Sequence, residues 1–171
     1  MSADSLERLP HNPLFERRFT LAISFYLQVA ANEVAIDGFI GSHHMTGLST
    51  TRFQRTRVTT DLDGHHSYLS FARKLRPGLA VSGEIMGQPV SGRASVRRGL
   101  VQLVGFAGQE PLQYQIQTGG AVTCRGGDLG VRVTQQALFT EVTGSVDRIA
   151  DALVAVCLVP LSLRGHEPDS V

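Results

Sequence analysis

The stretch FQRTRVTTDLDGHHSYLSFARKL, residues 53–75, contains the clearest β-hairpin of the chain. Before Asp63-Gly64, Val58 and Leu62 fall on the face opposite Arg55 and Arg57; after it, Leu69 and Phe71 share a face. Alternation with a period of two is typical of strands with one buried face, and Asp-Gly is a favoured two-residue hairpin turn. We therefore predict one antiparallel strand over about 53–62 and a second over about 65–75.

Short alternating segments separated by turn residues extend over most of the chain. Further turns are expected at Asp37-Gly38, Arg76-Pro77-Gly78, Gln88-Pro89, Gly108, Gly119-Gly120 and Gly126-Gly127. Further strands are expected over about 18–30, 33–48, 79–86, 93–106, 111–118, 121–125, 129–134 and 136–143. The predicted fold is all-β: an antiparallel β-barrel or strongly curved sheet of about eight to ten strands, with one C-terminal helix as an option.

That option concerns residues 145–163. Ser145 would cap a helix with an apolar face formed by Val146, Ile149, Ala150, Leu153 and Cys157. The valine content of this segment and Pro160 favour a buried strand instead. The pattern leaves helix and strand equally open.

Length and composition indicate one globular domain. The 171 residues are 42% hydrophobic and carry a net charge of +1. We expect a loose arm over residues 1–17, a single β domain over 18–163 and a tail over 164–171. A protein that binds nucleic acid over its whole surface would be more basic, so no nucleic-acid partner is expected.

No apolar run is long enough for a membrane span. Arg17-Arg18 before an apolar segment is similar to an export signal. However, apolar and polar residues alternate over 19–29, as in a strand. We therefore expect a soluble, cytoplasmic protein, with export as the alternative.

The second half of the chain resembles the small β domains found beside cholesterol-oxidase-like flavoenzymes. The resemblance covers about residues 79–142 and rests on these motifs: Gly83-Glu-Ile-Met-Gly87, Gly99-Leu-Val-Gln-Leu-Val104, Pro111-Leu-Gln-Tyr114-Gln-Ile116, Gly119-Gly120 and Gln136-Ala-Leu-Phe-Thr-Glu141. It implies a non-catalytic accessory domain with an oxidoreductase as partner. The chain contains no GxGxxG or GxSxG motif, and we expect no cofactor.

Four histidines occur as two adjacent pairs, His43-His44 and His65-His66. Neighbouring strand residues point to opposite faces, so each pair offers one histidine to the interior. If 33–48 is one strand, His44 shares the face of Ile36 and Ile40. By the same reasoning His65 shares the face of Leu69 and Phe71. We expect no metal site, because each pair supplies a single inward ligand.

Two other polar residues fall on predicted inner faces. Arg73 shares its face with Leu69 and Phe71, and it either anchors a ligand or reaches solvent from the strand end. Tyr114 lies on the inner face of its strand, where its hydroxyl needs a partner. The remaining middle-third arginines are interpreted as a solvated face, because aromatic rings for stacking on nucleic acid are scarce. Cys124 and Cys157 are expected to be inert thiols.

These residues predict two alternative functions. In the first, the barrel holds a small apolar or amphipathic molecule, either for binding alone or for a cofactor-free isomerisation or cyclisation. The candidate ligand-binding residues are His44, His65, Arg73, Tyr114, Phe25, Leu69 and Phe71. In the second, the chain is an accessory or protein-interaction domain, with a homodimer as a further option. An open apolar cavity favours the first function, and a filled barrel favours the second.

Overall fold

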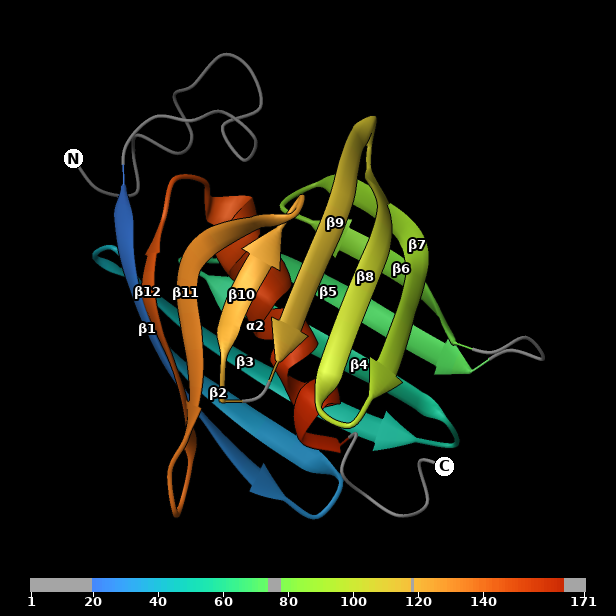
Figure 1. Cartoon of the computed structure of the whole chain (residues 1–171), viewed down its shortest axis with the longest axis horizontal. Coiled ribbons are helices and arrows are strands. Elements are labelled where there is room, and N and C mark those ends of the chain that lie inside the picture. Colours follow the sequence, from blue (N-terminus) through green and yellow to red (C-terminus); the bar gives the residue numbers. More distant parts are fainter. Residues whose placement is uncertain (1–19, 74–77, 118, 165–171) are drawn as a thin grey trace.

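The computed structural model describes residues 20–73, 78–117 and 119–164. Over these residues the chain forms a closed antiparallel barrel of twelve strands that surrounds one helix (Figure 1). The elements are β1 (Leu21–Ala30), β2 (Glu33–Ile40), β3 (His43–Arg52), β4 (Arg55–Leu62), β5 (His65–Arg73), β6 (Leu79–Ile85), β7 (Gln88–Arg97), β8 (Leu100–Ala107), β9 (Glu110–Gln117), β10 (Ala121–Cys124), β11 (Gly127–Gln135), β12 (Thr140–Val146) and α2 (Ile149–Arg164). The predicted barrel is confirmed, and β4 and β5 form the predicted hairpin around Asp63-Gly64.

The strand number exceeds the predicted eight to ten, partly because two expected strands are hairpins. Residues 33–48 cover β2 and most of β3, with a two-residue turn at Gly41-Ser42. Residues 93–106 cover the end of β7 and most of β8, with a turn at Arg98-Gly99. Both turns contain positive φ angles, as two-residue hairpins require. Such a short turn interrupts an alternating run by only two residues. The two strands that it joins are therefore easily taken for one continuous strand.

Each strand pairs with its neighbour in sequence, and β1 closes the barrel by pairing with β12. Phe25 of β1 lies opposite Val142 of β12 and opposite Gly38 of β2. On the other side of the barrel, Gly92 and Gly105 face each other across β7 and β8. A Cβ atom at either glycine would lie within 2.8 Å of the other residue's Cα. These two positions therefore need glycine for close approach of the strands.

Residues 145–163 are mostly helical, which settles the choice that the sequence left open. Two details differ from the helix that the sequence suggested. Ser145 belongs to β12 and does not cap the helix, and Pro160 lies within α2 and does not end it. The reason is tertiary: the barrel wall buries every residue from Ala150 to Ser162, and burial outweighs the weak helix propensity of valine.

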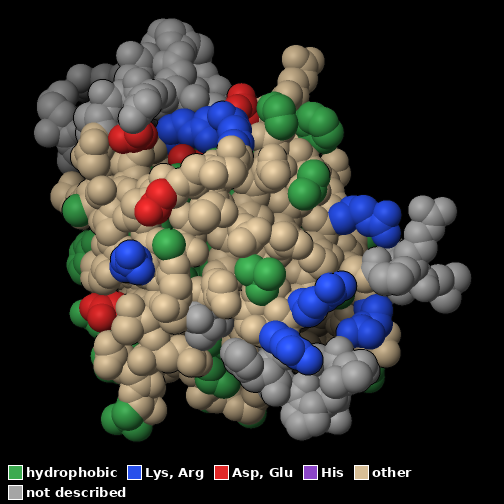
Figure 2. All heavy atoms as spheres, viewed as in Figure 1, with side chains coloured by type: hydrophobic (Ala, Val, Ile, Leu, Met, Phe, Trp, Pro, Cys, Tyr) green, Lys and Arg blue, Asp and Glu red, His purple; other side chains and the backbone are tan. Residues whose placement is uncertain are grey.

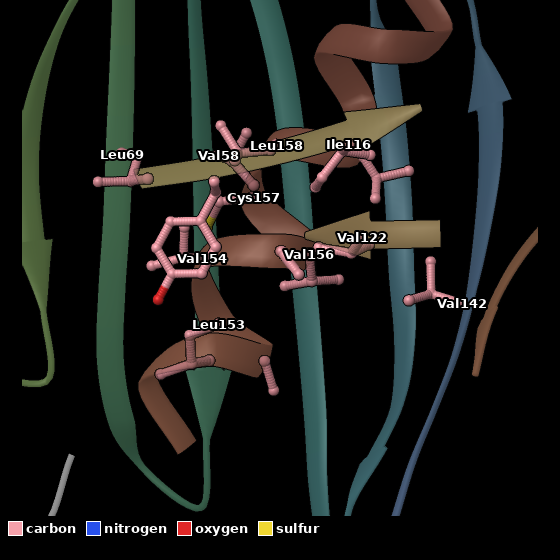
Figure 3. Close-up of a cluster of buried hydrophobic side chains, with 14 of the residues drawn as sticks. Val58, Leu69, Ile116, Val122, Val142, Leu153, Val154, Val156, Cys157 and Leu158 are labelled. Atoms are coloured by element: carbon pink, nitrogen blue, oxygen red, sulfur yellow. The ribbon is translucent and has the colours of Figure 1, made fainter. Parts of the chain in front are cut away.

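Helix α2 fills the barrel. An eight-stranded barrel is just wide enough for its own side chains, so twelve strands leave room for a helix. Sixteen residues of helix span about 24 Å, and a ten-residue strand tilted by about 40° rises about 25 Å along the barrel axis. Helix and wall therefore match in length. Figure 3 shows Leu153, Val154, Val156, Cys157 and Leu158 of α2 among wall residues that include Val58, Leu69, Ile116 and Val122.

The described part of the chain contains no helix that is both long and apolar enough to cross a membrane.

Candidate functional site

A buried polar cluster joins the start of α2 to the barrel wall. Tyr114 of β9 is 2% exposed and donates a hydrogen bond from its hydroxyl to Asp151 Oδ1, 2.5 Å away. Asp151 is 4% exposed and also accepts hydrogen bonds from Arg148, from Nη2 at 3.0 Å and Nε at 3.2 Å. A buried carboxylate is tolerated only when it is paired and hydrogen-bonded, and here both conditions are met.

The cluster continues toward the surface through Glu110. Its carboxylate lies 3.7 Å from Arg148 Nη1 and also forms an ion pair with Arg125. Arg125 sits in the turn between β10 and β11, so the cluster ties this turn and β9 to α2. Asp151 also stands in the first turn of the helix, where a negative charge interacts favourably with the helix dipole.

The titration behaviour of this cluster does not suit a nucleophile. Burial and the nearby Asp151 raise the pKa of Tyr114 well above its ordinary range, so the phenol stays protonated. Burial and Asp151 also raise the pKa of Cys124. A reactive cysteine needs a lowered pKa, so Cys124 has the opposite of an activating environment.

Cys157 is buried on α2, and burial raises its pKa to about 12. Both thiols are free, but Cys124 is only partly buried.

The structure reverses the predicted orientation of the first histidine pair. His43 is buried and pairs with Asp63, whereas His44 is exposed, with its Nε2 2.6 Å from Asp37 Oδ1. The cause is the turn at 41–42. Across a two-residue turn, Ile40 lies opposite His43 and shares its face, so the inward position shifts by one residue. The described residues contain no group of three or more His, Cys, Asp or Glu that could hold a metal ion.

The other candidate residues do not converge on one point. His65 lies opposite Leu62 near one end of the barrel and is half-buried, while Arg73 is exposed at the other end of β5. The three apolar candidates, Phe25, Leu69 and Phe71, are buried in the core that packs around α2. The sequence analysis missed Asp151 and Arg148. Their i, i+3 spacing was the available signal, and it has meaning only if this segment is helical.

The barrel end opposite the polar cluster carries a group of arginines. Arg52 of β3 lies opposite Arg55 of β4, and the same outward row continues through Ala72 and Ala80 to Arg93 of β7. Arg57 lies one outward position along β4. We call Arg52, Arg55, Arg57, Arg73 and Arg93, together with Phe53 and Tyr68, the arginine surface. Within the described residues, no carboxylate forms an ion pair with any of its five arginines.

Two aromatic rings lie within this surface. The guanidinium carbon of Arg57 stands 4.3 Å from the centroid of the Tyr68 ring, a cation–π contact. Phe53 is 96% exposed in the turn between β3 and β4. The backbone N–H of Arg73 donates a hydrogen bond to the carbonyl of Gln54, 3.1 Å away, which places the end of β5 beside this turn.

The β3–β4 turn is locally strained. Both central residues, Phe53 and Gln54, have positive φ angles of 49° and 65°. A bulky residue in this region is a conformational outlier, and Asn-Gly or Asp-Gly normally occupies such a turn. At the opposite end, the β4–β5 turn has the favoured Asp63-Gly64. Backbone strain is common at functional sites, and here it coincides with an aromatic ring that is almost fully exposed.

The net charge of +1 conceals a separation of charge between the two ends of the barrel. Asp61 and Asp63 lie at the end that holds the polar cluster, in which Arg125 and Arg148 balance Glu110 and Asp151, and the arginine surface extends to the other end. Figure 2 shows several Lys and Arg side chains at the lower right, toward the end where β5 and β7 finish; most visible Asp and Glu side chains lie at the upper left, together with further Lys or Arg side chains.

Comparison with known proteins identifies no relative: no family model, no curated protein and no solved structure matches this chain.

Proposed function

We propose that this chain is a non-catalytic binding domain that recognises its partner on the outer surface of the barrel. The observation that carries the proposal is the buried helix α2. From Ala150 to Ser162 each residue is buried on the inside of the barrel, so the chain itself occupies the space that a ligand would need. This is the filled barrel that favours a binding or accessory domain over a pocket protein.

The polar cluster supports the same proposal. A pocket for a small molecule would use Tyr114 to orient the ligand, but its hydroxyl already donates to Asp151. The charge of Asp151 is in turn balanced by Arg148. These groups hold the helix in the barrel, and none of them is positioned as a nucleophile beside a general base. An oxidoreductase as the protein partner remains an expectation from the resemblance of residues 79–142.

The competing function is a barrel that holds a small apolar molecule, with or without an isomerisation or cyclisation. Uptake of an apolar fluorescent probe distinguishes the two functions. We expect no saturable uptake by the unmodified protein. The positive control is Leu153→Ala, because removing a fully buried leucine from α2 opens an apolar cavity that small apolar probes can enter.

Saturable uptake by the unmodified protein that is weakened in Tyr114→Phe would overturn the proposal and support the small-molecule pocket. The thermal stability of each variant is measured in parallel, so that a loss of folding is not mistaken for a loss of uptake.

A further inference from the structure

We infer that the arginine surface binds single-stranded nucleic acid. The inference rests on the proposed function, since it names a partner class for the outer wall. The sequence analysis expected no such partner, because aromatic rings seemed scarce near the arginines. In the folded chain, Tyr68 lies against Arg57 and Phe53 lies between Arg52 and Arg55.

The charge of this surface favours a polyanionic partner. Five arginines occupy one continuous part of the surface and, within the described residues, have no carboxylate partner. The outward residues between Arg55 and Arg93 are Ala72 and Ala80, whose small side chains do not cover the guanidinium groups. Arg55 and Arg93 are separated by three strand spacings, about 14 Å across the wall. A short run of nucleotides can span this distance and place successive phosphates near both.

The aromatic rings of this surface favour an unpaired strand. Single strands are bound by basic surfaces that also present aromatic rings, because every base has a face that can stack. Phe53 exposes almost its whole ring, and Tyr68 is partly exposed beside Arg57. A double helix keeps its bases stacked inside and cannot use these rings, so an unpaired strand fits them better.

The shape of the surface favours a flexible partner. Tyr68 lies five residues before Arg73 on β5, about 17 Å along the barrel wall from that end. A flat bilayer resting on the end of the barrel would contact Phe53 but would not reach Tyr68 or Arg57 on the wall. A flexible strand can bend from the turn onto the wall and contact both rings. The surface is bounded by acidic Glu33 and Glu84, which lie opposite Thr50 and Tyr68.

The test measures binding of labelled oligothymidylate and oligouridylate of about 15 nucleotides by fluorescence anisotropy, at about 50 and about 200 mM salt. We expect binding that weakens with salt. Arg55→Gln and Arg93→Gln should each weaken binding and lower the salt slope by about 0.7, the value for one phosphate contact with a single strand. Phe53→Ser should weaken binding roughly 5- to 150-fold and leave the salt slope unchanged.

Matched controls are Arg132→Gln and Phe106→Ser, which change an exposed arginine and an exposed aromatic residue outside the arginine surface. Both should bind like the unmodified protein. Circular dichroism verifies that each variant is folded, as expected for exposed side chains.

The inference is overturned by any of four results. These are no oligonucleotide binding at the lower salt concentration, equal losses in the control variants, tighter binding of duplex DNA or polyglutamate, and Phe53-dependent binding to phosphatidylcholine–phosphatidylserine vesicles in place of oligonucleotides. If oligonucleotides fail to bind while the barrel still excludes the apolar probe, only the partner class is wrong and the proposed function stands.

Discussion

The hydroxyl of Tyr114 on β9 donates a 2.5 Å hydrogen bond to Asp151 on α2, linking the barrel wall to the helix that fills it. The two residues are 37 positions apart in the chain, and both are almost fully buried. Because Arg148 donates hydrogen bonds to both oxygens of the same carboxylate, Asp151 is the residue that joins Tyr114 to Arg148.

We therefore expect Asp151→Asn to lower the free energy of unfolding by ~3–5 kcal/mol, since it removes the buried negative charge that Arg148 and Tyr114 contact. Tyr114→Phe should cost ~1–3 kcal/mol, because it removes one hydrogen-bond donor from a buried acceptor. The double variant should lose less than the sum, because both changes remove the same contact. Urea unfolding measures all three values, and Tyr26→Phe, at an exposed tyrosine, is the control. Strictly additive losses would show that the two residues are not coupled.

Cys157 should make stability dependent on alkaline pH. Burial raises the pKa of its thiol from the ordinary 9.0 to about 12 in the folded chain. Above pH 9.0 the unfolded chain releases this proton while the folded chain keeps it, so stability is complete below pH 9.0 and falls as the pH rises toward about 12. The loss is ~1.4 kcal/mol for each pH unit in this window.

Unfolding free energies measured from about pH 8 to about pH 11 test this expectation. Cys157→Ala should flatten the decline, whereas Cys124→Ala, at a partly buried thiol, should flatten it less. Tyr114, whose pKa is also raised, should leave a residual decline above pH 10.0 in both variants. An unchanged pH profile in Cys157→Ala would contradict the assignment.

The packing of α2 predicts a large cost for truncating it. Leu153 is fully buried inside the barrel, so Leu153→Ala should lower the free energy of unfolding by ~2–5 kcal/mol. Leu138→Ala, at a leucine that is 83% exposed, should change it by less than ~0.5 kcal/mol. Guanidinium unfolding gives both values. Similar small losses in the two variants would mean that the packing of α2 contributes little to the free energy of unfolding.

The strained turn between β3 and β4 predicts a stabilising substitution. Replacing Phe53-Gln54 with Asn-Gly should raise the free energy of unfolding by ~1–2 kcal/mol, because Asn and Gly accept positive φ angles with little strain. The control is Arg98→Asn, which creates Asn-Gly at an exposed residue in a turn that already contains Gly99. Thermal denaturation compares the variants, and destabilisation by the Asn-Gly replacement would show that the turn is not strained.

The strand pattern shows which features of the fold local sequence can predict. The Asp63-Gly64 turn, with Val58 and Leu62 on one face before it and Leu69 and Phe71 on one face after it, predicted β4 and β5, because side-chain direction along a strand depends on backbone geometry. The turn at 41–42 shows where this reasoning fails. The two-residue turn shifts the alternation of inward and outward side chains by one residue. The sequence therefore predicted that His44 points inward, whereas in the structure His43 is the buried residue.

The sequence by itself determined an antiparallel β fold, a barrel or a strongly curved sheet, with apolar residues on its inner face, because hydrophobic periodicity and turn residues act locally. Only the tertiary structure decided that the valine-rich segment ending in Arg164 is a helix, since its form depends on burial by strands on several sides of the barrel. The same holds for the contacts of Tyr114 with Asp151 and of Arg57 with Tyr68. Each joins residues from different elements, and the closed barrel brings them together through long-range pairing that local sequence does not encode.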